Sequence, residues 1–204
     1  MESWPGVLAL GAAAFISTNV DGLLVLMVFF ADSEFAPAQI AAGQLAATAL
    51  WIVISVAASA AALALPTHWL ALLGLVPIVL GLTRLKVLRA SGDEPAEERT
   101  AVEAEKDRSL RRTHSRVGAV ALIALANGGD NVAVYVALFA TSTPTQIAAF
   151  SGVFLGLATV WCVAAYWLVR RTWLGVEIER YGERALPVVL IALGLYIVGK
   201  GLAG

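Results

Sequence analysis

Residues 15–31 read FISTNVDGLLVLMVFFA, an apolar run that carries a single polar cluster. The run extends back to Pro5, and its length suits a helix across a bilayer core, which is about 30 Å thick and needs about 20 residues. Asp21 stands near the middle of this run, where a carboxylate costs about 2.5–3.5 kcal/mol on membrane-insertion scales. An acid at that depth indicates a function within the membrane.

The chain as a whole is too apolar for a soluble domain. Hydrophobic residues make up 59% of it and charged residues 14%, with a mean hydropathy of +0.80, whereas soluble domains carry about 25% charged residues. The low charge content and the net charge of −1 also exclude a disordered chain and a nucleic-acid partner. The expected partner is the lipid bilayer.

Six apolar runs predict an all-α integral membrane protein. The runs lack the alternation of apolar and polar residues that is typical of a membrane β-barrel. The six expected transmembrane helices cover residues 5–31, 35–65, 69–88, 117–141, 145–169 and 185–201.

Lysine and arginine residues predict the orientation of these spans. Of the 14, nine lie in the segment 84–116, four lie in 170–184, and Lys200 is the last. Cytoplasmic loops carry an excess of these residues, and both basic segments fall on the same side of six spans. We therefore expect a multi-pass protein of the plasma (inner) membrane with both termini outside. The polar segment 90–115 is then a flexible cytoplasmic linker, with a helical piece over 97–112.

The two halves of the chain resemble each other weakly. Three pairs of segments match in order and at nearly one offset: 21–31 with 130–140, 37–42 with 144–149, and 77–80 with 187–190. Three spans in each half turn the second half over in the membrane, which predicts a 3+3 inverted-topology repeat of the kind found in many secondary transporters. The expected division is a first three-helix repeat at 1–89, the charged linker at 90–115 and a second three-helix repeat at 116–204.

A second polar cluster, residues 127–131 (NGGDN), lies in the middle of the fourth span. The repeat aligns Asp130 with Asp21, and equivalent mid-span residues of an inverted repeat approach each other at the bilayer midplane. Two carboxylates alone repel each other, so we expect a divalent cation between them. Amide and hydroxyl oxygens complete the site, and the predicted metal ligands are Asp21, Asp130, Asn19, Asn127, Asn131 and Thr18.

Weaker candidates for the substrate path are Ser17, Gln44, Gly128 and Gly129. The glycine pair, together with Gly22, favours interrupted helices whose freed backbone carbonyls add ligands. Two other interpretations of the polar groups stay open: hydrogen bonds that only lock the helix bundle, and a proton relay without metal. Gly152 and Gly156 fit a GxxxG pattern, for which packing within the bundle and a homodimer contact are equal alternatives.

The two polar motifs also carry a resemblance to a known family. Residues 18–21 (TNVD) followed by 23–27 (LLVLM), and residues 126–132 (ANGGDNV), resemble the motifs of the cadmium-resistance transporter (CadD-type) family within the lysine-exporter superfamily. The resemblance implies export of cadmium and other divalent cations, with ion-handling roles for Asn19, Asp21, Asn127, Asp130 and Asn131. The chain departs from the family's first motif at Gly22, where that motif has a second aspartate.

These features predict a secondary transporter that exports divalent metal cations from the cytoplasm. The chain carries no GxxxxGK[ST] motif, so an ion gradient is the expected energy source, with protons exchanged at Asp21 and Asp130. We expect no enzymatic activity and no cofactor, since the cation is the substrate. Oxygen ligands suit manganese, magnesium and calcium as well as cadmium, so the ligand set leaves the metal open.

Two other functions fit the same scaffold. The first is export of an amino acid or another small organic solute, which calls for a fixed cationic or aromatic partner, and no Lys or Arg lies mid-span. The second is an intramembrane metalloenzyme, which normally uses histidine ligands. His68 and His114 both lie outside the expected spans.

Overall fold

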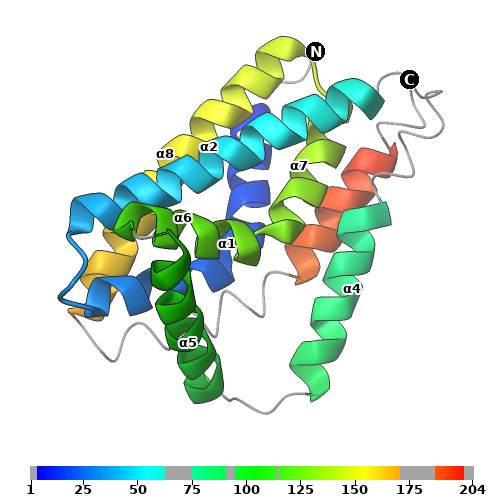
Figure 1. Ribbon diagram of the computed structural model, residues 1–204. Helices are drawn as coiled ribbons and strands as arrows, with labels where there is room; N and C mark the ends of the chain where they lie inside the picture. Colours follow the sequence, from blue (N-terminus) through cyan, green and yellow to red (C-terminus); the bar gives the residue numbers. More distant parts are fainter. Residues whose placement is uncertain (1–3, 63–74, 91–94, 114, 171–186, 200–204) are drawn as a thin grey trace.

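The described part of the chain is helical. The structure is a computed structural model that describes residues 4–62, 75–90, 95–113, 115–170 and 187–199. They form α1 (Trp4–Ala31), α2 (Pro37–Ala62), α4 (Leu75–Ala90), α5 (Pro95–Thr113), α6 (Arg116–Asn127), α7 (Gly129–Ala140), α8 (Pro144–Val169) and a C-terminal helix, Pro187–Gly199 (Figure 1). No strand occurs among these residues, which confirms the prediction of an all-α fold.

Within the described ranges, three helices are long and apolar enough to cross a membrane: α1, the part of α2 from Pro37 to Ala61, and α8. A fourth span results if α6 and the Asn131–Ala140 part of α7 are counted together, although they meet at a bend of 68°. The other two predicted spans correspond to α4 and the C-terminal helix, which are shorter, and the predicted ranges 69–88 and 185–201 both extend outside the described residues. The length and the apolar composition of these helices therefore indicate a multi-pass membrane protein.

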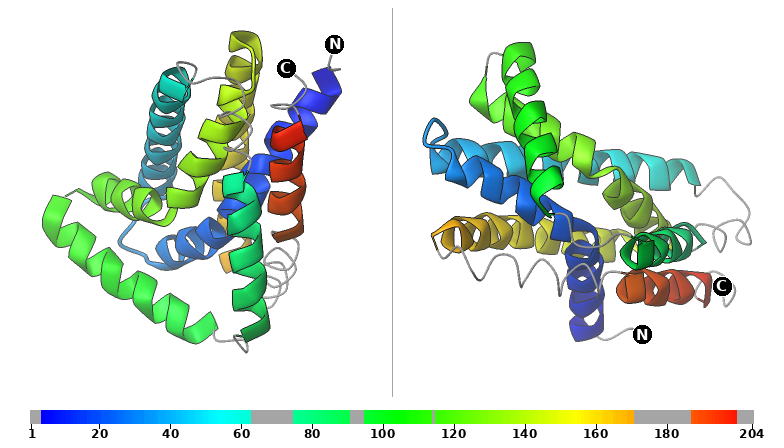
Figure 2. Two further views of the ribbon diagram at one scale, coloured as in Figure 1. Left: turned by 90° about the vertical axis from the view of Figure 1, so that its right-hand side faces the viewer. Right: turned by 90° about the horizontal axis from the view of Figure 1, so that it is seen from below.

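The helices of the two halves pack crosswise. α1 makes its most extensive contacts with α8, and α2 makes its own with α6 and α7, whereas α1 and α2 barely touch. Figure 2 shows α2 lying along the broken α6–α7 pair. Gly43 permits the approach of α2 to α6, because a Cβ there would lie 2.8 Å from the Val117 carbonyl oxygen.

An aromatic cluster holds α7 against α8 and α1. Phe15, Tyr135, Phe139, Phe150 and Phe154 are all fully buried, and the Tyr135 and Phe154 rings stack at a centroid distance of 4.2 Å. Offset-stacked rings at this distance contribute about 0.5–1.5 kcal/mol beyond the burial of their surface. The cluster fixes the half of the broken span that follows the bend.

The sequence predicts a helix break at Gly22, and the structure does not contain it. α1 runs without interruption from Trp4 to Ala31. A single glycine in a helix costs only about 1 kcal/mol relative to alanine, which is small beside the extensive packing of α1 on α8. Among the described residues, the fourth predicted span has a break, at Gly128 between α6 and α7.

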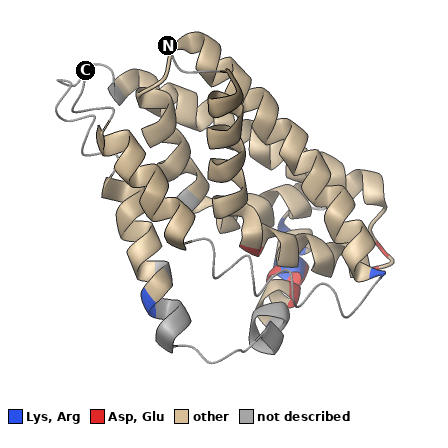
Figure 3. Cartoon of the chain, turned by 180° about the vertical axis from the view of Figure 1, so that it is seen from behind, with Lys and Arg blue, Asp and Glu red and all other residues tan. Residues whose placement is uncertain are grey.

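The helical piece predicted over 97–112 is present in the charged segment, but it is packed against the bundle and is not a free linker. Residues 95–113 form α5, which packs against α6 and the end of α1, and Val102 and Leu110 join the apolar cluster around Phe29 and Phe35. Most of the described charged residues gather at this end of the molecule (Figure 3). The start of α1 and the end of the C-terminal helix lie at the opposite end (Figure 1).

Candidate functional site

A small cavity lies between α1, α2, α6 and α7. Its volume is about 10 Å³, close to the lower limit for one water molecule. The residues that line it come from both polar motifs and from α2; they are Thr18, Asn19, Asp21, Gly22, Val25, Gln44, Trp51, Ala124, Asn127 and Asn131. The cavity therefore has room for a single small atom or ion, and its wall includes both polar and apolar side chains.

Asn19 and Asn131 join the two polar motifs directly. The Asn19 amide nitrogen donates to Asn131 Oδ1 at 2.9 Å, and the Asn131 amide nitrogen donates back to Asn19 Oδ1 at 3.4 Å. Both side chains are almost completely buried. This reciprocal amide pair links α1 to the first turn of α7 beside the cavity.

Two aromatic residues that the sequence analysis missed hold Asn19 in position. The Tyr135 hydroxyl lies 3.2 Å from the Asn19 amide nitrogen, and the Trp161 indole nitrogen donates to the Asn19 backbone carbonyl at 2.7 Å. Tyr135 belongs to α7 and Trp161 to α8, so Asn19 is held from two neighbouring helices. A buried Tyr or Trp carries a polar group that needs a partner, and this was the available sequence signal.

The Ser17 and Thr18 hydroxyls form hydrogen bonds within their own helix, α1. Ser17 donates to the Ala14 carbonyl at 2.9 Å, and Thr18 donates to the same carbonyl at 3.0 Å. Thr18 lines the cavity and its oxygen accepts from the Asn19 amide at 3.1 Å. Ser17 is not among the lining residues, although it was predicted on the substrate path.

Asp21 brings a carboxylate to the cavity from the continuous helix α1. The side chain is half-buried, and one of its oxygens accepts from the Gly22 backbone nitrogen at 2.9 Å. Gly22 also lines the cavity, and a Cβ built on it would meet no atom within 4 Å. The space beside Gly22 is open, so close packing is not the reason for a glycine at this position.

The second polar motif lies at the break between α6 and α7. Asn127 is the last residue of α6 and lines the cavity, and Gly128 is the buried residue between the two helices. Gly129 opens α7 and is exposed, with no atom near a Cβ built on it. Gly129 therefore lies at the break without lining the cavity.

Asp130 is the second residue of α7. Its backbone lies one residue before Asn131, which lines the cavity. The Asp130 side chain lies outside the described part of the structure, so the expected approach of the two aspartates stays a prediction.

Gln44 and Trp51 complete the wall on the side of α2. Both side chains are buried, at 5% and 4% exposure. Gln44 was predicted on the substrate path, while Trp51 was not singled out from the sequence. Its single polar atom is a donor, so Trp51 contributes shape to the cavity and no metal ligand.

The described lining offers oxygen ligands. They are the Asp21 carboxylate, the Thr18 hydroxyl and the side-chain carbonyls of the four amides. Cys162 belongs to an apolar cluster with Leu23 and Ile123 and does not line the cavity. Among the described residues, no group of three or more His, Cys, Asp and Glu residues gathers in one place.

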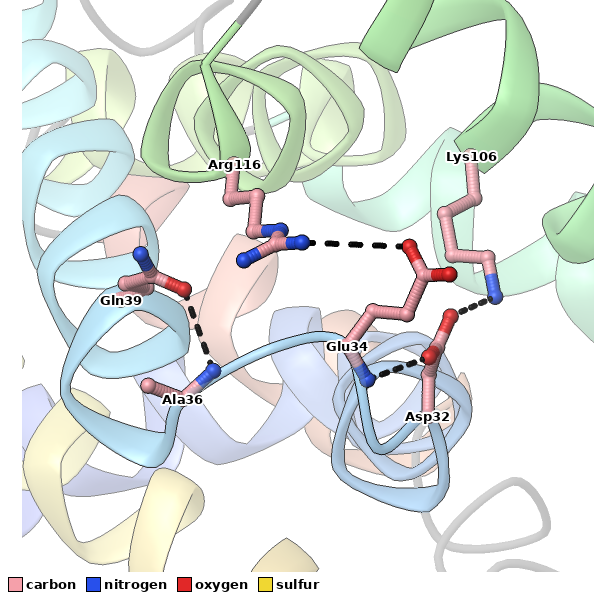
Figure 4. A network of polar contacts seen from close by, with 6 residues as sticks. All are labelled: Asp32, Glu34, Ala36, Gln39, Lys106 and Arg116. Carbon is pink, nitrogen blue, oxygen red and sulfur yellow. Dashed lines mark hydrogen bonds and ion pairs between the residues drawn. The ribbon is translucent and has the colours of Figure 1, made fainter.

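A second polar network lies at the end of α1 that carries the charged residues (Figure 4). Lys106 of α5 pairs with Asp32 at 2.6 Å, and Arg116 at the start of α6 lies 4.0 Å from Glu34. Because Lys106 donates a hydrogen bond to it, the Asp32 carboxyl has a pKa below its ordinary value of 3.8. The network ties α5 and α6 to the loop between α1 and α2.

The chain matches one family model over most of its length. The match covers residues 15–201 and is to the family described as cadmium resistance transporter. No curated protein and no solved structure shows significant similarity to the chain. The matched range contains both polar motifs, the cavity they line and the network around Asp32, and on this match the chain belongs to the cadmium resistance transporter family.

Proposed function

We propose that the protein is a secondary transporter that exports divalent metal cations from the cytoplasm through the cavity between α1, α2, α6 and α7. Asp21 and Asp130 supply the negative charge of the site. The amides of Asn19, Asn127 and Asn131 and the Thr18 hydroxyl supply neutral oxygens. Cadmium is the expected cargo because of the family to which the chain belongs.

One observation carries this proposal: a cavity of about 10 Å³ has a carboxylate and four side-chain amides among its lining residues. A hard or borderline divalent cation binds carboxylate and amide oxygens. The volume suits a single ion and falls far short of an amino acid, so it favours an ion over an organic solute as cargo.

Two features support the inverted repeat as the frame of the transporter. The first helix of each half packs on the second helix of the other half, as a pseudo-twofold axis requires. The matching motifs also begin their helices in the same way, since Gln39 accepts from the Ala36 nitrogen at 3.1 Å and Gln146 accepts from the Thr143 nitrogen at 2.9 Å. The proposed units are residues 1–89 and 116–204, joined by 90–115.

The proposed orientation keeps both termini outside and segment 90–115 in the cytoplasm. It rests on the excess of Lys and Arg in the segments 84–116 and 170–184. Single cysteines at Ser3 and Ser91, in a Cys162→Ser background, should react with an impermeant thiol reagent from opposite faces of the membrane. Labelling of Ser91 from outside and of Ser3 only from inside would reverse the proposed direction of every span.

Proton exchange gives the simplest coupling. Two neighbouring carboxylates hold protons when no cation is present, because their charges repel each other. A divalent cation displaces those protons, so metal export is expected to bring protons inward.

Reconstitution of the purified protein in sealed vesicles tests the proposal. An imposed pH gradient should drive uptake of cadmium, and a panel of zinc, manganese, calcium and lysine defines the substrate class. Asp21→Asn should abolish uptake, whereas Asp107→Asn on the exposed face of α5 is the matched control and should transport normally. Uptake of lysine with no uptake of any metal would replace the proposal by the organic-solute alternative.

A further inference from the structure

Trp51 of α2 lies directly over the break between α6 and α7. A Cβ built on Gly128 would overlap the six-membered ring of the Trp51 indole, at atoms Cζ2, Cη2 and Cε2. The indole is only 4% exposed, and α2 packs on both α6 and α7. The ring therefore occupies the space that a side chain at position 128 would need.

The backbone of Gly128 does not itself require glycine. Its φ is −102° and its ψ is 31°, values that other residues adopt in the bridge region. Its neighbour Gly129 has open space around it, with no atom within 4 Å of a Cβ built there. The need for glycine at 128 thus comes from contact with Trp51, and Gly129 provides a matched control one residue away.

Trp51 also lines the cavity, together with Asn127 and Asn131 on the two sides of the break. From these contacts we infer that Trp51 is a positioning residue, which sets the distance between α2 and the α6–α7 break and thereby the size of the ion cavity. The inference rests on the proposed function, because it assigns Trp51 to the same transport site. The indole itself provides no ligand oxygen.

The test uses five variants in vesicles and in detergent: Gly128→Ala, Gly129→Ala, Trp51→Phe, Trp51→Ala and the pair Trp51→Ala with Gly128→Ala. Gly128→Ala should lower cadmium uptake by about tenfold or more, as overpacking of a tight contact does, and should lower the melting temperature. Gly129→Ala should match the parent protein in both measurements. The double variant should regain folded protein and a higher uptake than Gly128→Ala alone.

Cation selectivity separates positioning from plain structural support. Trp51→Phe keeps an aromatic ring and shortens it, and Trp51→Ala removes it, so uptake of the large barium ion relative to cadmium should rise from the parent protein through Phe to Ala. An unchanged barium-to-cadmium ratio in both variants would overturn the inference. So would failure of Trp51→Ala to restore any folded protein to Gly128→Ala.

The failure of the proposed function gives a different result. If the parent protein transports no divalent cation, the proposed function falls. The contact between Trp51 and Gly128 is then judged by the melting temperatures of the same variants, and the cavity by the rise in melting temperature on adding cadmium. Loss of that rise in Trp51→Ala, with Gly129→Ala unchanged, supports the inference, and an equal rise in all variants overturns it.

Discussion

The first and fourth predicted spans carry similar polar motifs but have different backbones. α1 is continuous through Thr18, Asn19 and Asp21, and its hydroxyls donate to carbonyls one turn earlier in the same helix. The fourth span divides into α6 and α7 at Gly128, beneath Trp51. A glycine beside an aspartate is therefore not enough to break a helix: the space beside Gly22 is open, whereas Trp51 fills the space beside Gly128 at the break.

This difference assigns distinct tasks to the two sides of the cavity. α1 presents its carboxylate and amide from one continuous helix, which contacts α8 in part through the hydrogen bond from Trp161 to Asn19. The α6–α7 side presents Asn127 and Asn131 from two helices that meet at 68°. A change of that angle would move the two amides relative to each other, while Asp21 stays in place.

The largest effect is expected from the acids themselves. Asp21→Asn and Asp130→Asn should each lower metal transport by about a hundredfold or more, since a buried cation loses a compensating charge. The double variant should be no worse than either single variant, because both acids serve one ion. Without metal, all three proteins should melt at or above the temperature of the parent, because a carboxylate is costly to bury. Normal transport by either single variant would remove that acid from the mechanism.

Substitutions in the Asn19–Asn131 pair test which of the two residues contributes more to stability. Asn19→Leu should destabilise the protein by about 1–3 kcal/mol, because it leaves buried polar groups on Asn131 and Tyr135 with fewer partners. Asn131→Leu should cost less, since Asn19 keeps Tyr135 and the Phe15 carbonyl. Thermal unfolding in detergent compares the two variants. A larger loss of stability for Asn131→Leu than for Asn19→Leu would contradict this expectation and show that Asn131 of α7 contributes more to stability.

Gly22 sharpens the comparison because the space beside it is open. Gly22→Ala should keep normal transport and add up to about 1 kcal/mol of stability, as alanine is the better helix former. Gly22→Asp, which supplies the second acid of the family motif, should strengthen metal binding and move its pH optimum upward, because adjacent acids hold their protons more tightly. Isothermal titration with cadmium at several pH values measures both effects. Weaker binding by Gly22→Asp would exclude this side chain from the site.

The smallest effect is expected at the Asp32–Lys106 pair. Lys106→Met should cost less than about 1 kcal/mol, since partly exposed ion pairs contribute little. The folded-state pKa of Asp32 lies below 3.8, so the pair stabilises the protein above that pH and is lost as the pH falls below it. The rate at which a protease cleaves α5 at pH 7 and at pH 3 measures how much the pair contributes to docking of α5. Cleavage that is equally slow at both values, with no effect of Lys106→Met, would show that the apolar contacts of Val102 and Leu110 dock α5 alone.

Much of this architecture follows from residue patterns, and some of it depends on contacts that patterns do not contain. The long runs at 5–31 and 145–169 predict α1 and α8 to within a residue, because apolar length alone sets such helices. The matching segments PAQIAA and PTQIAA, noted in the sequence as part of a repeat, prove to be the starts of α2 and α8. Trp51 reads as one more apolar residue in a span, and only the folded chain brings its ring onto Gly128.

The docking of α5 is a second case. The segment 90–115 mixes acids and bases in the way a solvated tether does, and its helical part was predictable from composition. The sequence does not predict the ion pair between Lys106 and Asp32, because these residues lie 74 positions apart. The same holds for Tyr135 and Trp161, which approach Asn19 from helices far along the chain.

The packing of each half of the chain on the other has a consequence for synthesis of the protein. α1 and α2 leave the ribosome before α6, α7 and α8, on which they pack, have been made. At 5–20 residues per second, synthesis of the roughly one hundred residues between the end of α2 and the end of α8 takes on the order of ten seconds. During that interval α1 and α2 lack the helices that make most of their native contacts, α8 for α1 and the α6–α7 pair for α2. A chain truncated after α5 would lack these contacts permanently.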